Sequence, residues 1–230
     1  MKRYRNDTDG RLAVVETLQA LKTKGLNKGT SGNVSVRTTD GMLITPTGVA
    51  PDQLLPESIT HMSLSGEVDR DQLTPSSEWL LHADVYLARP DIAAVVHCHS
   101  PYATILACAR KSIPCMHYMV AAAGGRCIPL ADYATFGTRA LSESNLAALS
   151  STRACLLANH GQLATGPDIK TALKLAELVE EQAHCYWGTL AIGGPVLLDD
   201  CQMDAVVAAF ATYGQQQGRG KLPGGDVSGD

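Results

Sequence analysis

The sequence of 230 residues predicts an α/β protein with one domain, in which helices pack on a mixed β-sheet. Segments with the spacing of an amphipathic helix alternate along the chain with short apolar, β-branched segments. The pair Asp40-Gly41 separates two such short segments and indicates an antiparallel hairpin, which a purely parallel sheet does not contain. No break in composition divides the chain, so we expect one domain at residues 1–214 and a flexible, glycine-rich tail at 215–230.

The first part of the chain predicts a helix followed by that hairpin. Residues 12–24 carry apolar side chains on one side of a helix, and Gly25 stands where helices commonly end in the left-handed conformation. Residues 33–37 and 42–45 have the character of short strands on either side of the Asp-Gly turn. Pro46 then interrupts the second strand.

The rest of the chain predicts helices and strands in alternation. The hydroxyl-rich segment Thr74–Ser77 precedes an apolar-periodic stretch and is typical of a helix start, with Glu78 in the first helical turn. Asp168 is predicted to cap the longest helix. The predicted helices cover residues 79–89, 101–110, 169–190 and 204–213, and the predicted strands cover 92–99 and 153–159.

The composition excludes several classes of protein. Lys and Arg number 19 against 23 Asp and Glu, and the net charge of −4 argues against a nucleic-acid-binding protein, which usually presents a basic face. No apolar run approaches the roughly 20 residues of a membrane helix, and no apolar segment follows the basic start of the chain as in a secretory signal. Seven cysteines without paired spacing indicate reduced thiols. We therefore expect a cytoplasmic protein that binds neither nucleic acid nor membranes.

His97-Cys98-His99 is the sharpest local feature. Residues two apart in a strand point to the same face, roughly 6–7 Å apart, so both imidazoles can hold one divalent metal while Cys98 faces away. His160 follows an apolar strand and is a third candidate. Three histidines with one open position are the pattern of a catalytic zinc site, although each histidine alone is also compatible with packing or a backbone hydrogen bond. The other histidines are interpreted as surface or structural residues: His61, His82, His117 and His184.

Three further features are compatible with an anionic ligand and with acid–base chemistry. The loops Gly29–Asn33 and Thr45–Gly48 are rich in glycine and hydroxyl groups, and such loops expose N–H groups that can hold a phosphate. The helix start behind Ser76 and Ser77 adds a partial positive charge. Glu78 is a candidate acid–base carboxylate beside the metal, or simply a carboxylate that complements the helix dipole. Each loop taken alone is also compatible with an ordinary turn.

Five motifs occur in order along most of the chain. They are Gly25–Ser35, Ile44–Gly48, Pro75–Trp79, His97-Cys98-His99 and Asn159-His160-Gly161. Together they resemble the zinc-dependent class II aldolases of the L-fuculose-phosphate aldolase type, over residues from about 12 to 214. The wider superfamily includes L-ribulose-5-phosphate 4-epimerases and the adducin head, and Ser35 and the histidine motifs are signals at that level. Two segments are similar to fuculose-phosphate aldolases in particular: Ile113–Gly125 and Tyr133–Thr138.

The resemblance implies a three-layer α/β/α fold around a mixed, largely antiparallel sheet, and a cyclic homotetramer with active sites between subunits. It implies one zinc ion per subunit, and a phosphate site in the glycine and hydroxyl loops. Tyr118 matches a catalytic tyrosine contributed by a neighbouring subunit, and Tyr213 matches a second tyrosine that acts near the aldehyde. The implied zinc ligands are His97, His99, His160 and, without substrate, Glu78. The implied phosphate ligands are Gly32, Asn33, Thr47, Gly48, Ser76 and Ser77.

These implications lead to a hypothesis of reversible retro-aldol cleavage. The substrate would be a ketose 1-phosphate of the L-fuculose 1-phosphate type, and the products would be dihydroxyacetone phosphate and L-lactaldehyde. Ser100-Pro101-Tyr102 and the tail after Gly214 differ from the fuculose enzymes that the chain resembles, and we expect both to lie in regions that can set aldehyde specificity. The alternatives are an aldolase for a 5-deoxy- or 5-methylthio-pentulose 1-phosphate, a sugar-phosphate 4-epimerase, and a non-catalytic binding module like the adducin head.

Overall fold

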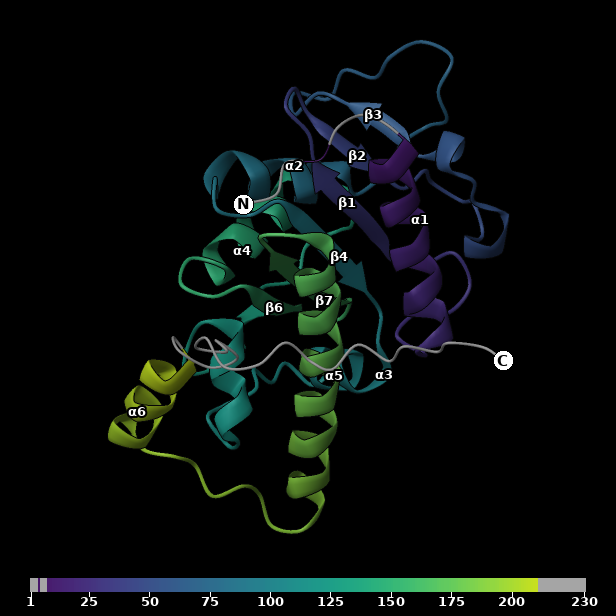
Figure 1. Cartoon of the computed structure of the whole chain (residues 1–230). Coiled ribbons are helices and arrows are strands. Elements are labelled where there is room, and N and C mark those ends of the chain that lie inside the picture. The colour runs from purple at the N-terminus through teal and green to yellow at the C-terminus, as the bar shows by residue number, and fades with distance from the viewer. Residues whose placement is uncertain (1–3, 5–7, 211–230) are drawn as a thin grey trace, which may run out of the picture.

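Seven strands form one mixed sheet at the centre of the molecule, as the sequence predicts (Figure 1). The computed structural model describes residues 4 and 8–210. The strands lie in the order β3-β2-β1-β4-β7-β6-β5, and every neighbouring pair is antiparallel except β5 and β6. The strands are β1 (Asn33–Arg37), β2 (Met42–Ile44), β3 (Thr60–Met62), β4 (Ala94–Cys98), β5 (Leu130–Ala131), β6 (Ala154–Leu157) and β7 (Gly161–Gly166).

Helices cover both faces of the sheet, which confirms the three-layer α/β/α arrangement (Figure 1). One face carries α1 (Thr8–Thr23), α3 (Pro101–Cys108) and α5 (Ile169–Ala191). The other face carries α2 (Trp79–Ala88) and α4 (Arg139–Ala148). The last described helix, α6 (Asp200–Phe210), packs on the short 3-10 helix η3 (Tyr118–Ala123).

Strand β4 shows how the sequence divides the core between these layers. Ala94, Val96 and Cys98 point to the layer of α1, α3 and α5. Val95 points to the layer of α2 and α4, and His97 follows it on the same face because side chains alternate along a strand. The prediction that Cys98 faces away from the histidines is therefore confirmed, because its side chain packs in the opposite apolar layer. Burial there raises the pKa of its thiol.

Several element boundaries differ from the predicted ones. Strand β1 and the left-handed Gly25, with φ of 72°, are as predicted, but α1 begins four residues before the predicted start. The final helix begins at Asp200, not at residue 204, because Asp199 accepts the N–H of Gln202 and caps it earlier. Residues 211–213 of the predicted final helix and the tail 215–230 lie outside the described residues. Among the described helices, none has both the length and the apolar character needed to cross a membrane.

Candidate active site

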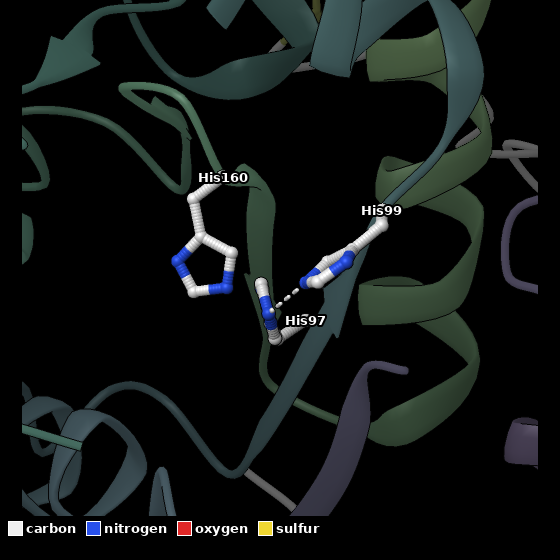
Figure 2. A group of neighbouring side chains, drawn as sticks. All are labelled: His97, His99 and His160. Carbon is white, nitrogen blue, oxygen red and sulfur yellow. Dashed lines mark hydrogen bonds between the residues drawn. The ribbon is translucent and has the colours of Figure 1, made fainter. Parts of the chain in front are cut away.

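The three histidines predicted as metal ligands converge on one point (Figure 2). Their ring nitrogens lie within 4.8 Å of one another. The Nε2 atoms of His97 and His99 are 3.1 Å apart, and the three ring centroids are separated by 4.7 to 4.9 Å. Residues from two distant segments of the chain thus form a single cluster of donors.

Local backbone bonds hold each ring in place. His97 lies on β4, and its Nδ1–H donates to the carbonyl of Gln162 on β7 at 2.8 Å, which directs Nε2 toward the cluster. The backbone N–H of His99 donates to Oδ1 of Asn27 at 2.9 Å. His160 sits in the tight turn between β6 and β7, where Asn159 adopts a left-handed conformation with φ of 56°.

Glu78 brings a carboxylate to the same cluster. Its oxygens lie 3.3 Å from Nε2 of His97 and 3.4 Å from Nε2 of His160, and Oε2 accepts a hydrogen bond from Nδ2 of Asn33 at 2.9 Å. The prediction that Glu78 occupies the first turn of its helix is wrong by one position: Glu78 is the N-cap of α2. The N–H of Glu78 donates to Oγ of Ser76, so a hydroxyl of the predicted capping segment bonds the residue that directly precedes the helix.

The charges of these groups are strongly coupled. Burial alone would raise the pKa of Glu78, but the neighbouring His97 and His160 outweigh burial and hold that pKa well below its usual value. Burial would lower the pKa of His97, but the Glu78 carboxylate outweighs it and the net pKa is raised. Burial and the charge of His97 lower the pKa of His99 to about 3 and that of His160 to about 4. His99 and His160 are therefore neutral near pH 7, as metal ligands must be.

This donor set fits a divalent metal. Three imidazole nitrogens with one carboxylate oxygen are a usual ligand set for zinc. Oε1 of Glu78 is buried and has no hydrogen-bond partner among the described residues, so it is an orphaned acceptor beside the cluster. A metal held by His97, His99 and His160 would satisfy it.

A cavity of about 330 Å³ opens beside the cluster and contains the residues predicted to bind phosphate. Backbone bonds join two of its loops: Ser76 N–H donates to the carbonyl of Thr45, and Thr47 N–H donates to the carbonyl of Thr74, both at 3.0 Å. Tyr133 and Phe136, which the sequence analysis did not assign to the site, also line this cavity. The predicted phosphate residues that line it are Gly32, Asn33, Thr47, Gly48, Ser76 and Ser77, together with Glu78, His99 and His160.

Gly32 shows why this loop requires a glycine. Its φ is 75°, a conformation that side-chain-bearing residues rarely adopt. A Cβ at this position would stand 2.7 Å from the carbonyl oxygen of His97 and would also collide with the side-chain amide of Asn27. The backbone of the loop therefore lies directly against the strand that carries the histidines.

Comparison with known proteins agrees with this arrangement. The chain matches the family described as "Class II Aldolase and Adducin N-terminal domain" over residues 12–187. This chain belongs to that family. The class II aldolase fold also matches a solved structure of an L-fuculose 1-phosphate aldolase, with a TM-score of 0.86, 37% identity, and coverage of 89% of this chain and 97% of that one.

Two curated relatives carry different substrate names. A 5-methylthioribulose-1-phosphate/5-deoxyribulose-1-phosphate aldolase of Rhodospirillum rubrum is 48% identical over 204 residues, which cover 89% of this chain and 92% of the relative. An L-fuculose phosphate aldolase of Escherichia coli K12 is 46% identical over 202 residues, which cover 87% and 94%. Both relatives are named as aldolases, while the sugar phosphate in the name differs between them.

Of the two tyrosines implied by the resemblance, Tyr118 lies among the described residues. Tyr118 starts η3, is 51% exposed and stacks on Phe210 of α6, and it does not line the cavity of its own chain. Tyr213 lies outside the described residues.

Sequence reasoning missed the connection of His82 and Ser35 to the site. His82 is fully buried and hydrogen-bonds both Ser35 and Asn33. The signal was present in the spacing, because His82 lies four residues after Glu78, one turn along the same helix face. His82 is buried, as expected of a structural residue, but the sequence did not predict its hydrogen bonds to Ser35 and Asn33.

Proposed function

We propose that this class II aldolase catalyses the reversible retro-aldol cleavage of a ketose 1-phosphate to dihydroxyacetone phosphate and a small aldehyde, with L-fuculose 1-phosphate and L-lactaldehyde as the leading pair. The observation that carries the proposal is the shared cavity. The cavity lies between loops of the kind that bind anions and a histidine cluster of the kind that binds a metal. The Glu78 carboxylate lies beside that cluster. A ketose phosphate needs both ends of such a site at once.

The glycine and hydroxyl loops would bind the phosphate. Gly32, Asn33, Thr47, Gly48, Ser76 and Ser77 all line the cavity, and residues of these types offer backbone N–H groups, hydroxyls and an amide to a phosphate. Phosphate binding far from the reacting carbons supplies binding energy that fixes the carbon chain beside Glu78.

His97, His99 and His160, together with Glu78 before substrate binds, would hold one zinc ion per subunit. A bound zinc ion supplies Lewis-acid stabilisation of the negative charge that develops when the C3–C4 bond breaks. Neutral imidazole ligands leave the positive charge of such an ion undiminished.

Glu78 and a tyrosine would move the protons. In cleavage, a tyrosine in its phenolate form takes the proton of the C4 hydroxyl as the C3–C4 bond breaks, and Glu78 in its protonated form delivers a proton to C3 of the departing three-carbon unit. In the synthetic direction Glu78 removes that proton from dihydroxyacetone phosphate. We assign the first role to Tyr118 of a neighbouring subunit in a homotetramer, because Tyr118 is exposed and lies outside its own cavity, and we assign Tyr213 to the aldehyde end.

The relative from Rhodospirillum rubrum supports a second candidate substrate. Cleavage of 5-deoxyribulose 1-phosphate gives dihydroxyacetone phosphate and acetaldehyde, and a 5-methylthio group yields the methylthio derivative of acetaldehyde. Phe136 and Tyr133 present apolar surface to the cavity and would suit a methyl or methylthio group as well as the methyl of lactaldehyde.

A substrate panel tests the proposal. Purified protein with zinc is incubated with L-fuculose 1-phosphate, 5-deoxyribulose 1-phosphate, 5-methylthioribulose 1-phosphate and L-ribulose 5-phosphate. We expect free dihydroxyacetone phosphate from at least one of the three ketose 1-phosphates, and mass spectrometry of the trapped aldehyde identifies the preferred substrate. Epimerisation of L-ribulose 5-phosphate without any free dihydroxyacetone phosphate would replace the aldolase by a 4-epimerase. No turnover of any of these compounds would favour a binding module like the adducin head.

A further inference from the structure

A row of buried polar side chains runs from the interior of the molecule to the carboxylate of Glu78. Oη of Tyr86 lies 2.7 Å from Oγ of Ser35, and Oγ of Ser35 lies 2.7 Å from Nδ1 of His82. Nε2 of His82 lies 2.5 Å from Oδ1 of Asn33, and Nδ2 of Asn33 lies 2.9 Å from Oε2 of Glu78. All five residues are at most 7% exposed. Polar side chains buried in a core destabilise the folded protein unless each group forms a hydrogen bond. We therefore expect the hydrogen bonds along this row to have defined directions.

Two periodicities build this row. Asn33 and Ser35 are two residues apart on β1 and therefore point to the same face of the sheet, toward α2. Glu78, His82 and Tyr86 are four residues apart, from the N-cap of α2 into its third turn, and therefore share one face of the helix. The helix thus lays three polar groups against two on the strand.

The chemistry of the groups sets the direction of each hydrogen bond. An ionised carboxylate only accepts, so Asn33 must present its Nδ2–H to Glu78 and its Oδ1 to the other side. Oδ1 also only accepts, so Nε2 of His82 must carry a hydrogen.

The inner half of the row agrees with that direction. A neutral imidazole has one N–H, which leaves Nδ1 of His82 to accept from the Ser35 hydroxyl, and Ser35 in turn accepts from Tyr86. Burial first, and the charge of His97 second, lower the pKa of His82 to about 3, so that the ring stays neutral. Burial also raises the pKa of Tyr86, which keeps its hydroxyl a donor.

The amide of Asn33 is the group whose orientation matters to the site. Asn33 lines the cavity and borders the proposed phosphate position. In the orientation described, Nδ2 donates one N–H to Glu78, and we expect its second N–H to serve an anion in the cavity. If the amide turned over, its oxygen would face the Glu78 carboxylate, and two acceptors would repel each other. On the inner side of Asn33, the bond from Nε2–H of His82 favours the same orientation that the Glu78 carboxylate favours on the outer side.

We propose that His82 is a positioning residue that locks the Asn33 amide with both of its N–H groups toward the anionic side of the site. This inference rests on the proposed function for the phosphate, and it adds a residue that does not line the cavity. Loss of the Nε2–H donor lets the amide turn over, which places an acceptor toward the phosphate and releases Glu78 from its aligned position.

Three variants separate positioning from structure. His82→Met keeps a side chain of similar length without a donor, His82→Gln keeps an N–H near the place of Nε2, and Tyr86→Phe removes the inner end of the row while leaving the lock intact. We expect His82→Met to weaken binding of inorganic phosphate to the zinc-loaded protein by about tenfold or more and to lower kcat by about 10²-fold. His82→Gln should recover most of both losses. Tyr86→Phe should stay within about threefold of the unchanged protein although it too removes a buried hydrogen bond. Equal losses in His82→Met and Tyr86→Phe would overturn the proposal.

Nitrogen-15 NMR of the imidazoles in the unchanged protein gives a readout that needs no turnover. We expect His82 to remain the Nε2–H tautomer, with Nδ1 unprotonated, from pH 5 to pH 8. An Nδ1–H tautomer with an unprotonated Nε2 in that range contradicts the lock, whatever the substrate proves to be. A protein that shows the expected tautomer but cleaves no ketose phosphate contradicts the proposed function and leaves the positioning of Asn33 supported.

Discussion

Gly32→Ala is a sharp test of how closely the phosphate loop and the histidine strand are packed. The loop contains a second glycine, Gly29, that serves as a matched control. Both glycines have positive φ, 63° at Gly29 and 75° at Gly32, so a Cβ strains the backbone at either position. They differ in their surroundings: a Cβ at Gly29 meets nothing within 4 Å, whereas one at Gly32 meets Asn27 and His97.

The expected cost follows from these two contributions. A left-handed residue with a Cβ costs about 1–2 kcal/mol, which is the whole expected loss in free energy of unfolding for Gly29→Ala. At Gly32 the Cβ also stands 2.7 Å from the carbonyl of His97. Asn27 cannot simply turn away, because its Oδ1 accepts the N–H of His99. Such overpacking adds about 1–3 kcal/mol, so we expect a total of about 2–5 kcal/mol for Gly32→Ala.

Urea unfolding of the metal-free proteins and zinc titration of the folded ones give the two readouts. We expect Gly29→Ala to bind zinc as the unchanged protein does, and Gly32→Ala to bind it at least about tenfold more weakly, because displacement of His97 or His99 disturbs the ligand geometry. If the two alanine variants lose equal stability and bind zinc equally well, the close approach between loop and strand has no energetic role.

Three other predictions concern the site. Glu78→Gln should retain phosphate binding and lower the cleavage rate by about 10²-fold or more, the usual scale for a general acid–base group, and near-normal turnover would remove Glu78 from that role. Mixing inactive Glu78→Gln subunits with Tyr118→Phe subunits under reassociating conditions should restore part of the activity if Tyr118 serves a neighbouring subunit, and no recovery would place its role within one chain. In acid, His82 takes up a proton in the unfolded chain below about pH 6.5 but in the folded protein only near pH 3, so the free energy of unfolding should fall with decreasing pH across that window. In the metal-free protein that slope should be smaller in His82→Gln by up to about 1.4 kcal/mol per pH unit, and identical slopes would mean that His82 titrates normally.

The regular elements could be predicted wherever one short segment contains its own signal. Strand β1 and helix α5 follow their apolar periodicity within a residue or two, and the N-cap Asp168 accepts the N–H of Thr171 as a capping residue does. Strands β3 and β5 were missed because two or three residues contain no periodicity. Strand β7 was missed because glycines stand at both of its ends, and its pairing with β4 and β6 supplies what its sequence does not.

The site likewise contains features that the sequence predicts and features that it does not. The histidine cluster could be predicted because His97 and His99 are two residues apart at the end of one strand and His160 follows another strand. The link between His82 and Asn33 could not, because it depends on how α2 lies across β1, which neither segment determines alone. Helix α2 begins at Trp79, as predicted, and Glu78, whose N–H donates to Oγ of Ser76, is its N-cap and does not lie in its first turn.

X-ray absorption at the zinc edge tests the central claim most directly, since it counts the ligands of the bound ion. We expect nitrogen and oxygen ligands at about 2.0–2.1 Å with the multiple scattering of three imidazoles. One imidazole should be lost in His160→Ala and none in His184→Ala, a histidine that stacks on Tyr102 away from the cluster. A sulfur ligand at about 2.3 Å, or a spectrum that His160→Ala leaves unchanged, would contradict the account.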